Sequence, residues 1–175
     1  MRRYNTGRGR GAASGGAVMA LTQVEAFQRR YQSWGTPQWL FDRLNAQYGP
    51  FTLDPCAEPW NAKCKLYYTA EENGLVQSWA GHRVFLNPPW GKISPWASKA
   101  IESSLVLGTV IVGVLPTRTD VAWFQDCVIG PGAHWWTLRG RVRYDAPPWC
   151  ESAKGATEGT CIVVWGQKEA IKCRY

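Results

Sequence analysis

The stretch Val84-Phe85-Leu86-Asn87-Pro88-Pro89-Trp90 joins an apolar run to an amide, two prolines and an indole. A short apolar run bounded by turn-forming residues is typical of a buried strand, and we expect one from Arg83 to Leu86. Proline has no N–H group, and the residue before a proline is biased towards extended backbone. Asn87 and Pro88 are therefore expected to lie beyond the end of this strand, outside any helix.

The residues that follow this strand could bind a planar amino group. The side-chain oxygen of Asn87 and the carbonyl of Pro88 can each accept one hydrogen of an exocyclic amine, while Trp90 stacks on its ring. Such an amine on adenine or cytosine is a weak nucleophile, because its lone pair is delocalised. Two aligned acceptors would favour a pyramidal nitrogen and turn its lone pair towards a methyl donor, mainly in the transition state. Taken alone, the four residues are equally typical of a rigid turn that ends a strand.

Length and composition indicate a globular protein. The chain has 175 residues, of which 45% are hydrophobic and 13% aromatic, enough to form a real core. We find no internal repeat and no second domain, so the sequence predicts a single domain over 21–175.

The opening segment has a different composition. Residues 1–20 are rich in Gly, Ala and Ser and contain Arg2, Arg3, Arg8 and Arg10, which supply four of the seven net positive charges. This composition predicts a disordered basic tail. The tail could hold a polyanion weakly, or it could be solvated without a partner. The rest of the chain is mildly basic, which is compatible with nucleic acid but not diagnostic of it.

The sequence excludes several other classes of protein. The longest apolar stretch, residues 110–115, is too short to span a bilayer, and the basic start lacks the apolar centre of a signal peptide. Six cysteines include no Cys-x-x-Cys pair, and His82 and His134 are the only histidines. We therefore expect reduced thiols, a cytoplasmic location, and neither a metal nor a membrane partner.

Upstream of the strand expected at 83–86, the residues from Thr36 to Gly49 predict a helix. Thr36 is a good N-cap, Pro37 suits the first helical position, and Gly49 suits the end. Apolar residues then fall on one helical face: Leu40, Phe41, Leu44 and Tyr48.

Strands and helices alternate through most of the remaining chain. We expect strands at 51–53, 83–86 and 109–115, a helix from Ser94 and Pro95 to about Leu105, and a short helix from about Thr119 or Asp120. Continuous apolar strands separated by helices predict an α/β fold with a mostly parallel sheet covered on both faces. Ligands bind such sheets beyond the carboxyl ends of the strands. Three polar groups would share that rim: Asp54, Asn87 and the segment Pro116-Thr117-Arg118.

The last third indicates antiparallel structure. Residues 135–138 and 142–145 flank Arg139-Gly140-Arg141, which predicts a C-terminal antiparallel hairpin with a glycine turn. A further strand at 160–165 would complete the sheet.

At this point the chain resembles the phage-type DNA N-6-adenine methyltransferases, the phage Dam family, from about Ser33 to Trp165. The resemblance depends on an ordered series of segments: Ser33-Trp34-Gly35-Thr36-Pro37, Phe51-Thr52-Leu53-Asp54, Asn61-Ala62-Lys63-Cys64, Leu86-Asn87-Pro88-Pro89-Trp90, Leu115-Pro116-Thr117-Arg118-Thr119-Asp120 and Arg139-Gly140-Arg141. Asn-Pro-Pro-aromatic alone is less specific, because protein glutamine and ribosomal RNA methyltransferases also carry it.

The resemblance implies a trimmed Rossmann-like fold and transfer of a methyl group from S-adenosylmethionine to the exocyclic amine of adenine in DNA. It implies that the catalytic loop is Asn87, Pro88, Pro89 and Trp90. It also implies a donor site formed by Trp34, Thr36, Pro37, Asp54, Pro55, Cys56 and Ala57. Asp54 could pair with the ammonium group of the donor or accept from its hydroxyls, or it could simply begin the turn at Pro55. Thr36 is equally well explained as a helix cap.

Two features depart from larger enzymes of this class. The segment Pro55-Cys56-Ala57-Glu58-Pro59 has no glycine, where those enzymes have a Gly-rich turn after the first strand. In addition, too few residues separate Asp54 from Asn87 for two complete strand and helix units. The sheet must be trimmed there, or the segment from Asn61 to Trp79 must be mostly loop.

A separate target-recognition domain cannot fit after Trp90, so DNA contacts would have to come from loops. The best candidates for contacts with double-stranded DNA are Lys92, Arg118, Arg139, Arg141 and Arg143. Aromatic residues near the glycine turn could add base stacking. Alternatively, these charges belong to a solvated hairpin edge and discourage strand pairing. Because an amine inside a duplex cannot reach the donor, the enzyme should flip the adenine out towards Trp90.

Two other hypotheses remain open. The chain could methylate another planar amine, in cytosine, RNA or a protein glutamine, or it could be a non-catalytic nucleic-acid-binding module. Asn in place of Ser before the two prolines favours adenine over cytosine within the family. The resemblance also suggests a phage origin, action in the bacterial or phage-infected host cytoplasm, and a role in protecting or regulating a genome.

Overall fold

The computed structural model describes residues 34–150 and 156–166, and the predicted basic tail lies outside these ranges. The described residues form an α/β fold around a mixed sheet with the strand order β1-β2-β4-β3. Its strands are β1 (Arg83–Leu86), β2 (Val110–Pro116), β3 (His134–Thr137) and β4 (Thr160–Trp165). β1 and β2 are parallel, whereas β4 runs antiparallel to both of its neighbours, β2 and β3. The predicted α/β class is therefore confirmed, but a mostly parallel sheet is not.

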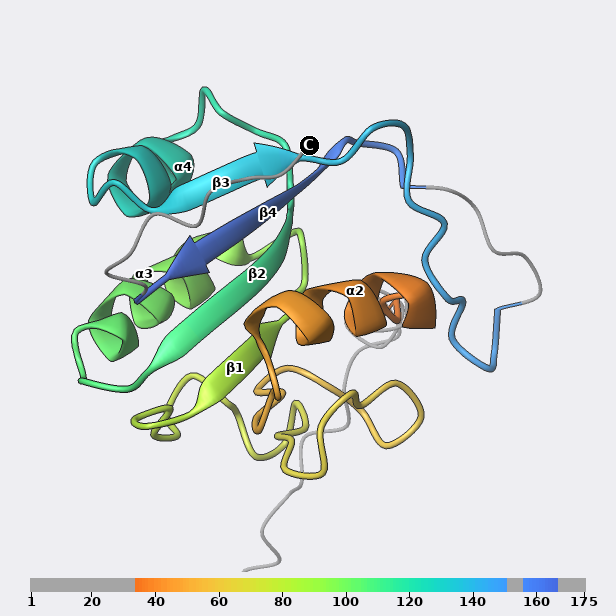
Figure 1. Cartoon of the computed structure of the whole chain (residues 1–175). Helices are drawn as coiled ribbons and strands as arrows, with labels where there is room; N and C mark the ends of the chain where they lie inside the picture. The colour runs from red at the N-terminus through yellow and green to blue at the C-terminus, as the bar shows by residue number, and fades with distance from the viewer. Residues whose placement is uncertain (1–33, 151–155, 167–175) are drawn as a thin grey trace, which may run out of the picture.

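Helices cover both faces of the sheet (Figure 1). Helix α2 (Gln38–Tyr48) lies on one face, and α3 (Ile93–Ser104) lies on the other together with α4 (Ala122–Phe124). The chain continues from α4 into a π-helical turn, η1 (Gln125–Ile129). Two buried layers result, one on each side of the sheet.

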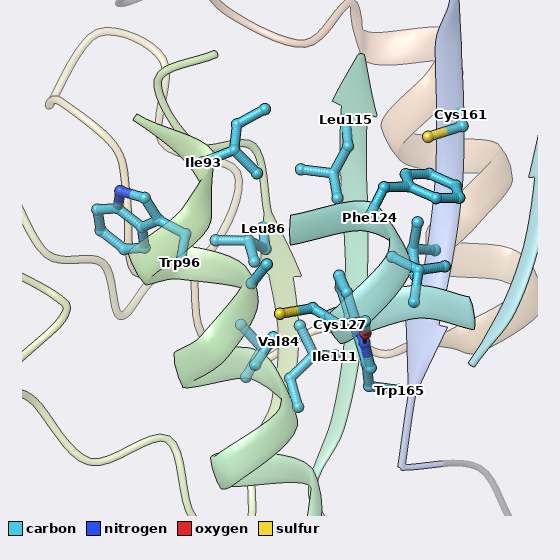
Figure 2. Packing of buried hydrophobic residues seen from close by; sticks show 14 of the residues in the cluster. Val84, Leu86, Ile93, Trp96, Ile111, Leu115, Phe124, Cys127, Cys161 and Trp165 are labelled. Carbon is cyan, nitrogen blue, oxygen red and sulfur yellow. Dashed lines mark hydrogen bonds between the residues drawn. The ribbon is translucent and has the colours of Figure 1, made fainter. Parts of the chain in front are cut away.

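The alternation of side chains along each strand explains how one sheet contributes to both buried layers. Successive side chains of a strand point to opposite faces. Ile111 and Leu115 of β2 accordingly pack against α3 and α4, as Figure 2 shows, whereas Val112 and Val114 pack on the α2 side. In β1, Phe85 faces α2 and meets Phe41 edge to face, with ring centroids 5.1 Å apart.

The predicted helices are present, but their first residues differ from the predictions. The apolar face of α2 is buried and the helix ends at Gly49, as expected. Its N-cap, however, is Pro37 in extended backbone, and no side chain caps the helix, so the prediction that Thr36 is the N-cap is wrong. Helix α3 begins one residue before the predicted Ser94.

The expected strand at 51–53 is reduced to isolated bridges. Leu53 pairs in parallel with Val84, and Asp54 pairs in parallel with Tyr67. Proline has no N–H to donate to a ladder, and Pro50 and Pro55 bracket this segment. The stretch from Asn61 to Trp79 contains neither a helix nor a named strand, which confirms the expectation that it is mostly loop.

The predicted hairpin between 135–138 and 142–145 is wrong. In the described structure β3 pairs with β4, and Leu138 continues this pairing by donating from its N–H to the carbonyl of Thr160. Beyond Gly140, which has a φ of 81°, the chain instead carries Asp145 to a two-hydrogen-bond bridge with Gly35. Burial of Val142 and Tyr144 on the α2 side accounts for this path.

Candidate active site

Polar residues from separate segments meet at the carboxyl edge of the sheet. Asp54 follows the bridged residue Leu53, and Asn87 follows the neighbouring strand β1. Both line one cleft with about 180 Å³ of free space, counting its open side. Its lining residues are Gly35, Thr36, Asp54, Cys56, Asn61, Lys63, Phe85 and Asn87.

Asp54 is a buried carboxyl group that is only partly satisfied by the protein. Its side chain is 3% exposed, and Oδ2 accepts a hydrogen bond of 3.1 Å from the backbone N–H of Lys63. Oδ1 has no hydrogen-bond partner among the described residues. Burial raises the pKa of Asp54 to about 6, against the opposing effect of the Lys63 and Cys56 backbone N–H groups. At neutral pH the cleft therefore holds a carboxylate with an oxygen free to bind a ligand.

Thr36 contributes a second unsatisfied group to the cleft. The residue is 2% exposed, and its Oγ1 also lacks a partner in the described part of the chain. A buried hydroxyl without a hydrogen bond is unfavourable, and a polar ligand would remove that penalty. The two unpaired atoms of Thr36 and Asp54 thus fit a ligand with hydroxyl or ammonium groups.

Asn87 is held in a fixed orientation at the edge of the same cleft. Its Nδ2 donates a hydrogen bond of 3.1 Å to the backbone carbonyl of Trp34. Since the amide oxygen points away from that bond, Oδ1 can accept from another molecule. Trp34 therefore contributes to the site through its backbone carbonyl, which holds Asn87. The turn that follows Asn87 is closed by a hydrogen bond of 3.0 Å from the Lys92 N–H to the Pro89 carbonyl.

Trp90 is partly buried beside this loop. Its ring meets that of Tyr144 at 82°, with centroids 5.4 Å apart. The hydroxyl of Tyr144 forms a hydrogen bond of 3.2 Å with Thr160 Oγ1 at the start of β4. Burial raises the pKa of Tyr144, which keeps its phenol neutral. Tyr144 therefore fixes Trp90 against the sheet.

The structure brings together only some of the residues expected to form the donor site. Thr36, Asp54 and Cys56 line the cleft, whereas Trp34, Pro37, Pro55 and Ala57 do not. The N–H of Ala57 is used in the fold, donating to the Tyr68 carbonyl over 3.1 Å.

No site role was predicted for three lining residues, Asn61, Lys63 and Phe85, whereas Gly35 lies within the segment 34–37 that resembles the family. Asn61 and Lys63 occur in one of the segments that resemble the family, which was the available signal. Asn61 Oδ1 accepts from the Glu58 N–H over 2.7 Å, so this side chain orders the loop beside the cleft. Gly35 leaves room, because a Cβ atom there would lie 3.3 Å from both Asn61 Cβ and Asp145 Cβ.

The expected DNA-binding cations lie in different environments. Lys92, Arg139, Arg141 and Arg143 are exposed. Arg118 instead forms a two-pronged ion pair with Glu158, through Nε and Nη2. This pairing raises the pKa of Arg118 and lowers the pKa of Glu158. The charge of Arg118 is therefore largely balanced within the protein.

Residues 34–150 and 156–166 contain neither a membrane-spanning helix nor a metal-binding cluster. No helix there combines the length and apolar character that a membrane crossing requires. These ranges also hold no group of three or more His, Cys, Asp or Glu side chains that could bind a metal ion.

Comparison with known proteins identifies the family of the chain. A family model described as DNA N-6-adenine-methyltransferase (Dam) matches residues 24–173. The chain is 33% identical over 96 residues to the DNA N-6-adenine-methyltransferase of Haemophilus phage HP1 (strain HP1c1), covering 54% of this chain and 56% of that protein. It is 33% identical over 128 residues to the DNA N-6-adenine-methyltransferase of Escherichia phage T1, covering 65% and 53%. The chain thus spans about half the length of these curated relatives. Because the family model covers most of the sequence, the chain belongs to the DNA N-6-adenine-methyltransferase (Dam) family.

Proposed function

We propose that the protein is a DNA adenine methyltransferase that transfers a methyl group from S-adenosylmethionine to the exocyclic amine of an adenine. The observation that carries this proposal is the position of Asn87, whose amide is fixed in the cleft that also holds the unpaired oxygens of Asp54 and Thr36. Family membership supports the same reaction, and the mixed sheet is consistent with a trimmed Rossmann-like methyltransferase domain over 21–175.

The residues of the cleft fit the methyl donor. When bound, S-adenosylmethionine supplies an activated methyl group on a sulfonium sulfur. The Asp54 carboxylate would accept hydrogen bonds from its ammonium or ribose hydroxyls, and Thr36 Oγ1 would bind a second polar group. Cys56 would line the wall as a neutral thiol, since burial raises its pKa. Pro37, Pro55 and Ala57 would support this wall from behind.

The loop after β1 would hold the acceptor. Asn87 Oδ1 and the Pro88 carbonyl would each accept one hydrogen of the adenine amine and direct its lone pair towards the methyl group. Trp90, fixed by Tyr144, would stack on the base. S-adenosylmethionine would supply the methyl group, while Asn87 Oδ1 and the Pro88 carbonyl would hold the amine that receives it and that then releases a proton to water.

The substrate would be double-stranded DNA with the target adenine flipped out. An amine within a base pair cannot reach a cleft where the neighbouring carboxyl group is 3% exposed, so the base has to leave the stack. The exposed cations at the rim, Lys92, Arg139, Arg141 and Arg143, would contact the DNA phosphates. Acting on DNA, the enzyme would work in the cytoplasm of a bacterium or of a phage-infected host.

The first test is transfer of labelled methyl from S-adenosylmethionine to unmethylated DNA, followed by nucleoside analysis of the digest. The parent protein should yield N6-methyladenine, and Asn87→Ala should lose nearly all turnover while still binding the donor. Asn87→Asp keeps the acceptor oxygen but loses the donor to Trp34, so it should retain more turnover than Asn87→Ala.

Two results would contradict the proposal. Label in cytosine, RNA or protein, and none in adenine, would assign a different planar amine as substrate. Loss of donor binding together with turnover in Asn87→Ala would show that Asn87 holds the donor or the fold instead of the acceptor.

A further inference from the structure

Two side chains of opposite charge line the cleft beside Asn87 without pairing with each other. Asp54 and Lys63 both contribute to its wall. Burial raises the pKa of Asp54, and the positive charge of Lys63 acts against that rise, so the two groups lie within electrostatic reach of one another. Within residues 34–150 and 156–166 they nevertheless form no ion pair, and Asp54 Oδ1 has no hydrogen-bond partner. The cleft thus offers one anionic oxygen and one cation that do not neutralise each other directly.

The Lys63 side chain is held in place but is not neutralised. It is partly buried, and its Nζ donates a hydrogen bond of 3.1 Å to Oε1 of Gln38, the first residue of α2. The amide nitrogen of Gln38 in turn donates to Asp42 over 2.8 Å, which leaves the amide oxygen to Lys63. An ammonium group has three N–H donors, so two remain for a ligand. In the part of the chain that the structure describes, no carboxylate pairs with this charge.

Residues 55–58, which follow Asp54, have no backbone donor left for an anionic ligand. Pro55 lacks an N–H group. The next three residues already donate from their N–H groups to acceptors of the protein: Cys56 to the Asp54 carboxyl group, Ala57 to the Tyr68 carbonyl and Glu58 to Asn61 Oδ1. A carboxylate bound in this cleft therefore depends on side chains, and Lys63 is the cation among the lining residues.

Size and charge indicate which part of the donor the cleft takes. Its free space of about 180 Å³ is below the roughly 300–1,000 Å³ of a site that encloses a whole small molecule, so one end of a ligand fits. The adenine and ribose of S-adenosylmethionine are uncharged, whereas its amino-acid end carries an α-ammonium and an α-carboxylate on the same carbon atom. Opposite charges that share a cleft without pairing are complementary to that zwitterion.

We propose that the cleft binds the amino-acid end of the methyl donor, with the Lys63 ammonium on its α-carboxylate and the Asp54 carboxylate on its α-ammonium. This inference rests on the proposed function for the identity of the ligand. It adds a carboxylate contact to that function, and it selects the ammonium over the ribose hydroxyls as the partner of Asp54.

Calorimetric affinities for two ligands test the carboxylate contact. The ligands are S-adenosylmethionine and its decarboxylated analogue, which keeps the amine and the sulfonium but has no carboxylate. The full-length parent should prefer S-adenosylmethionine by about tenfold or more, the usual effect of a hydrogen bond to a charged group. Lys63→Gln should lose most of this preference, because it weakens binding of S-adenosylmethionine and leaves the affinity for the analogue unchanged. Lys63→Arg keeps a cation and should keep the preference.

Lys65→Gln is the matched control. Lys65 is an exposed lysine two residues further along the chain, and it does not line the cleft. Its replacement removes the same charge and should leave both affinities like those of the parent. Binding of the analogue, measured in every variant, shows that the site is folded.

The outcomes separate this inference from the proposed function. If Lys63→Gln keeps the preference of the parent, or loses affinity equally for both ligands, in a protein that methylates adenine, the carboxylate contact is overturned and the reaction stands. A parent that binds both ligands equally also overturns the contact. If the preference disappears in Lys63→Gln but not in Lys65→Gln, and the parent makes no methyladenine, the contact is supported and the proposed reaction is refuted. A parent that binds neither ligand refutes both.

Discussion

Two buried side chains, Asp54 and Thr36, have polar atoms without partners in the described structure. Such atoms are costly in a folded protein, at about 1–3 kcal/mol each. Both face the same cleft, where a ligand can remove this cost. This arrangement is expected of a binding site, where stability is given up for affinity.

Asp54 should make the stability of the ligand-free protein depend on pH. Its pKa is 3.8 when unperturbed and about 6 in the fold. Its contribution to stability is complete below pH 3.8 and is lost as the pH rises through about 6, because the fold then contains a buried charge. A shift of this size corresponds to about 3 kcal/mol. Urea unfolding should show parent stability falling relative to Asp54→Asn by up to that amount between pH 4 and pH 7.5.

The comparison with Asp54→Asn cancels the titration of all other groups. If the difference in unfolding free energy between the two proteins is the same at both pH values, Asp54 is not buried as a costly charge. Asp54→Asn should also lose donor affinity at neutral pH, where the parent carboxylate would attract an ammonium group.

Thr36→Val should increase the stability of the ligand-free protein and weaken donor binding. Valine has nearly the same shape but no hydroxyl, so the variant no longer buries an unpaired polar atom. Chemical unfolding should show a gain of about 1 kcal/mol, and calorimetry should show donor affinity reduced about tenfold.

Thr69→Val provides the contrast for this experiment. The hydroxyl of Thr69 already bonds Glu72 over 3.1 Å, so its removal should lower stability slightly and leave donor binding intact. If Thr36→Val instead lost about 1 kcal/mol of stability, the hydroxyl would be acting as a helix cap after all.

At the residue level, the positions of the cleft residues differ in how well the sequence predicts them. Asn87 and Asp54 could be predicted because each follows an apolar run at a position where parallel strands end. Asn61 and Lys63 could not be predicted from periodicity, since they reach the cleft through a loop, and their only signal was the segment that resembles the family. Thr36 had a sufficient local explanation as a cap, and only the three-dimensional structure shows that its hydroxyl is unused.

Among the elements, the strands buried on both faces were the most predictable. The apolar runs of β1 and β4 match their predicted residues, because such runs have few other stable environments. The hairpin was mispredicted because glycine between two short β-prone segments specifies a turn but not the partner of either segment. β4 is buried along its whole length and pairs on both sides, and it takes β3 as its second neighbour.

The loop that precedes β1 packs at Gly74 against the segment that carries Asp54. A Cβ atom at this buried glycine would collide with the backbone carbonyl of Pro55, the residue after Asp54. The Gly74 carbonyl also accepts a hydrogen bond of 2.9 Å from the indole of Trp79. Gly74→Ala should therefore displace the segment that carries Asp54, lower the unfolding free energy by about 2–3 kcal/mol and weaken donor binding.

Gly108→Ala is the control that separates a steric collision from the backbone strain that alanine causes at a glycine of positive φ. Gly108 has a φ of 84° and nothing within 4 Å of a Cβ atom, so alanine there adds backbone strain alone. That variant should lose about 1 kcal/mol and keep its donor affinity. A similar loss in both variants, with donor binding unchanged in Gly74→Ala, would show that the loop adapts without moving Asp54.

For the whole molecule, the sheet topology gathers the functional groups on one edge. The parallel pair β1 and β2 ends there, β4 begins there, and the cleft lies beyond the end of β1. If a duplex lies across this edge, as proposed, its adenine amine is still paired, so the cost of extruding the base would enter the free energy of binding.

The cost of extrusion can be varied in the substrate while the protein stays the same. Once the methylated site has been mapped, a mismatched base opposite the target adenine should tighten binding several-fold, because a mismatched adenine costs less to unpair and unstack. A mismatch two base pairs away provides the control and should give little gain. Trp90→Ala should lose affinity for both substrates, since it removes the stacking surface that Tyr144 holds in place. Equal affinity of the parent for paired and mismatched adenine would mean that the base stays in the helix when DNA binds, and that Trp90 supports the loop of Asn87 instead of receiving the base.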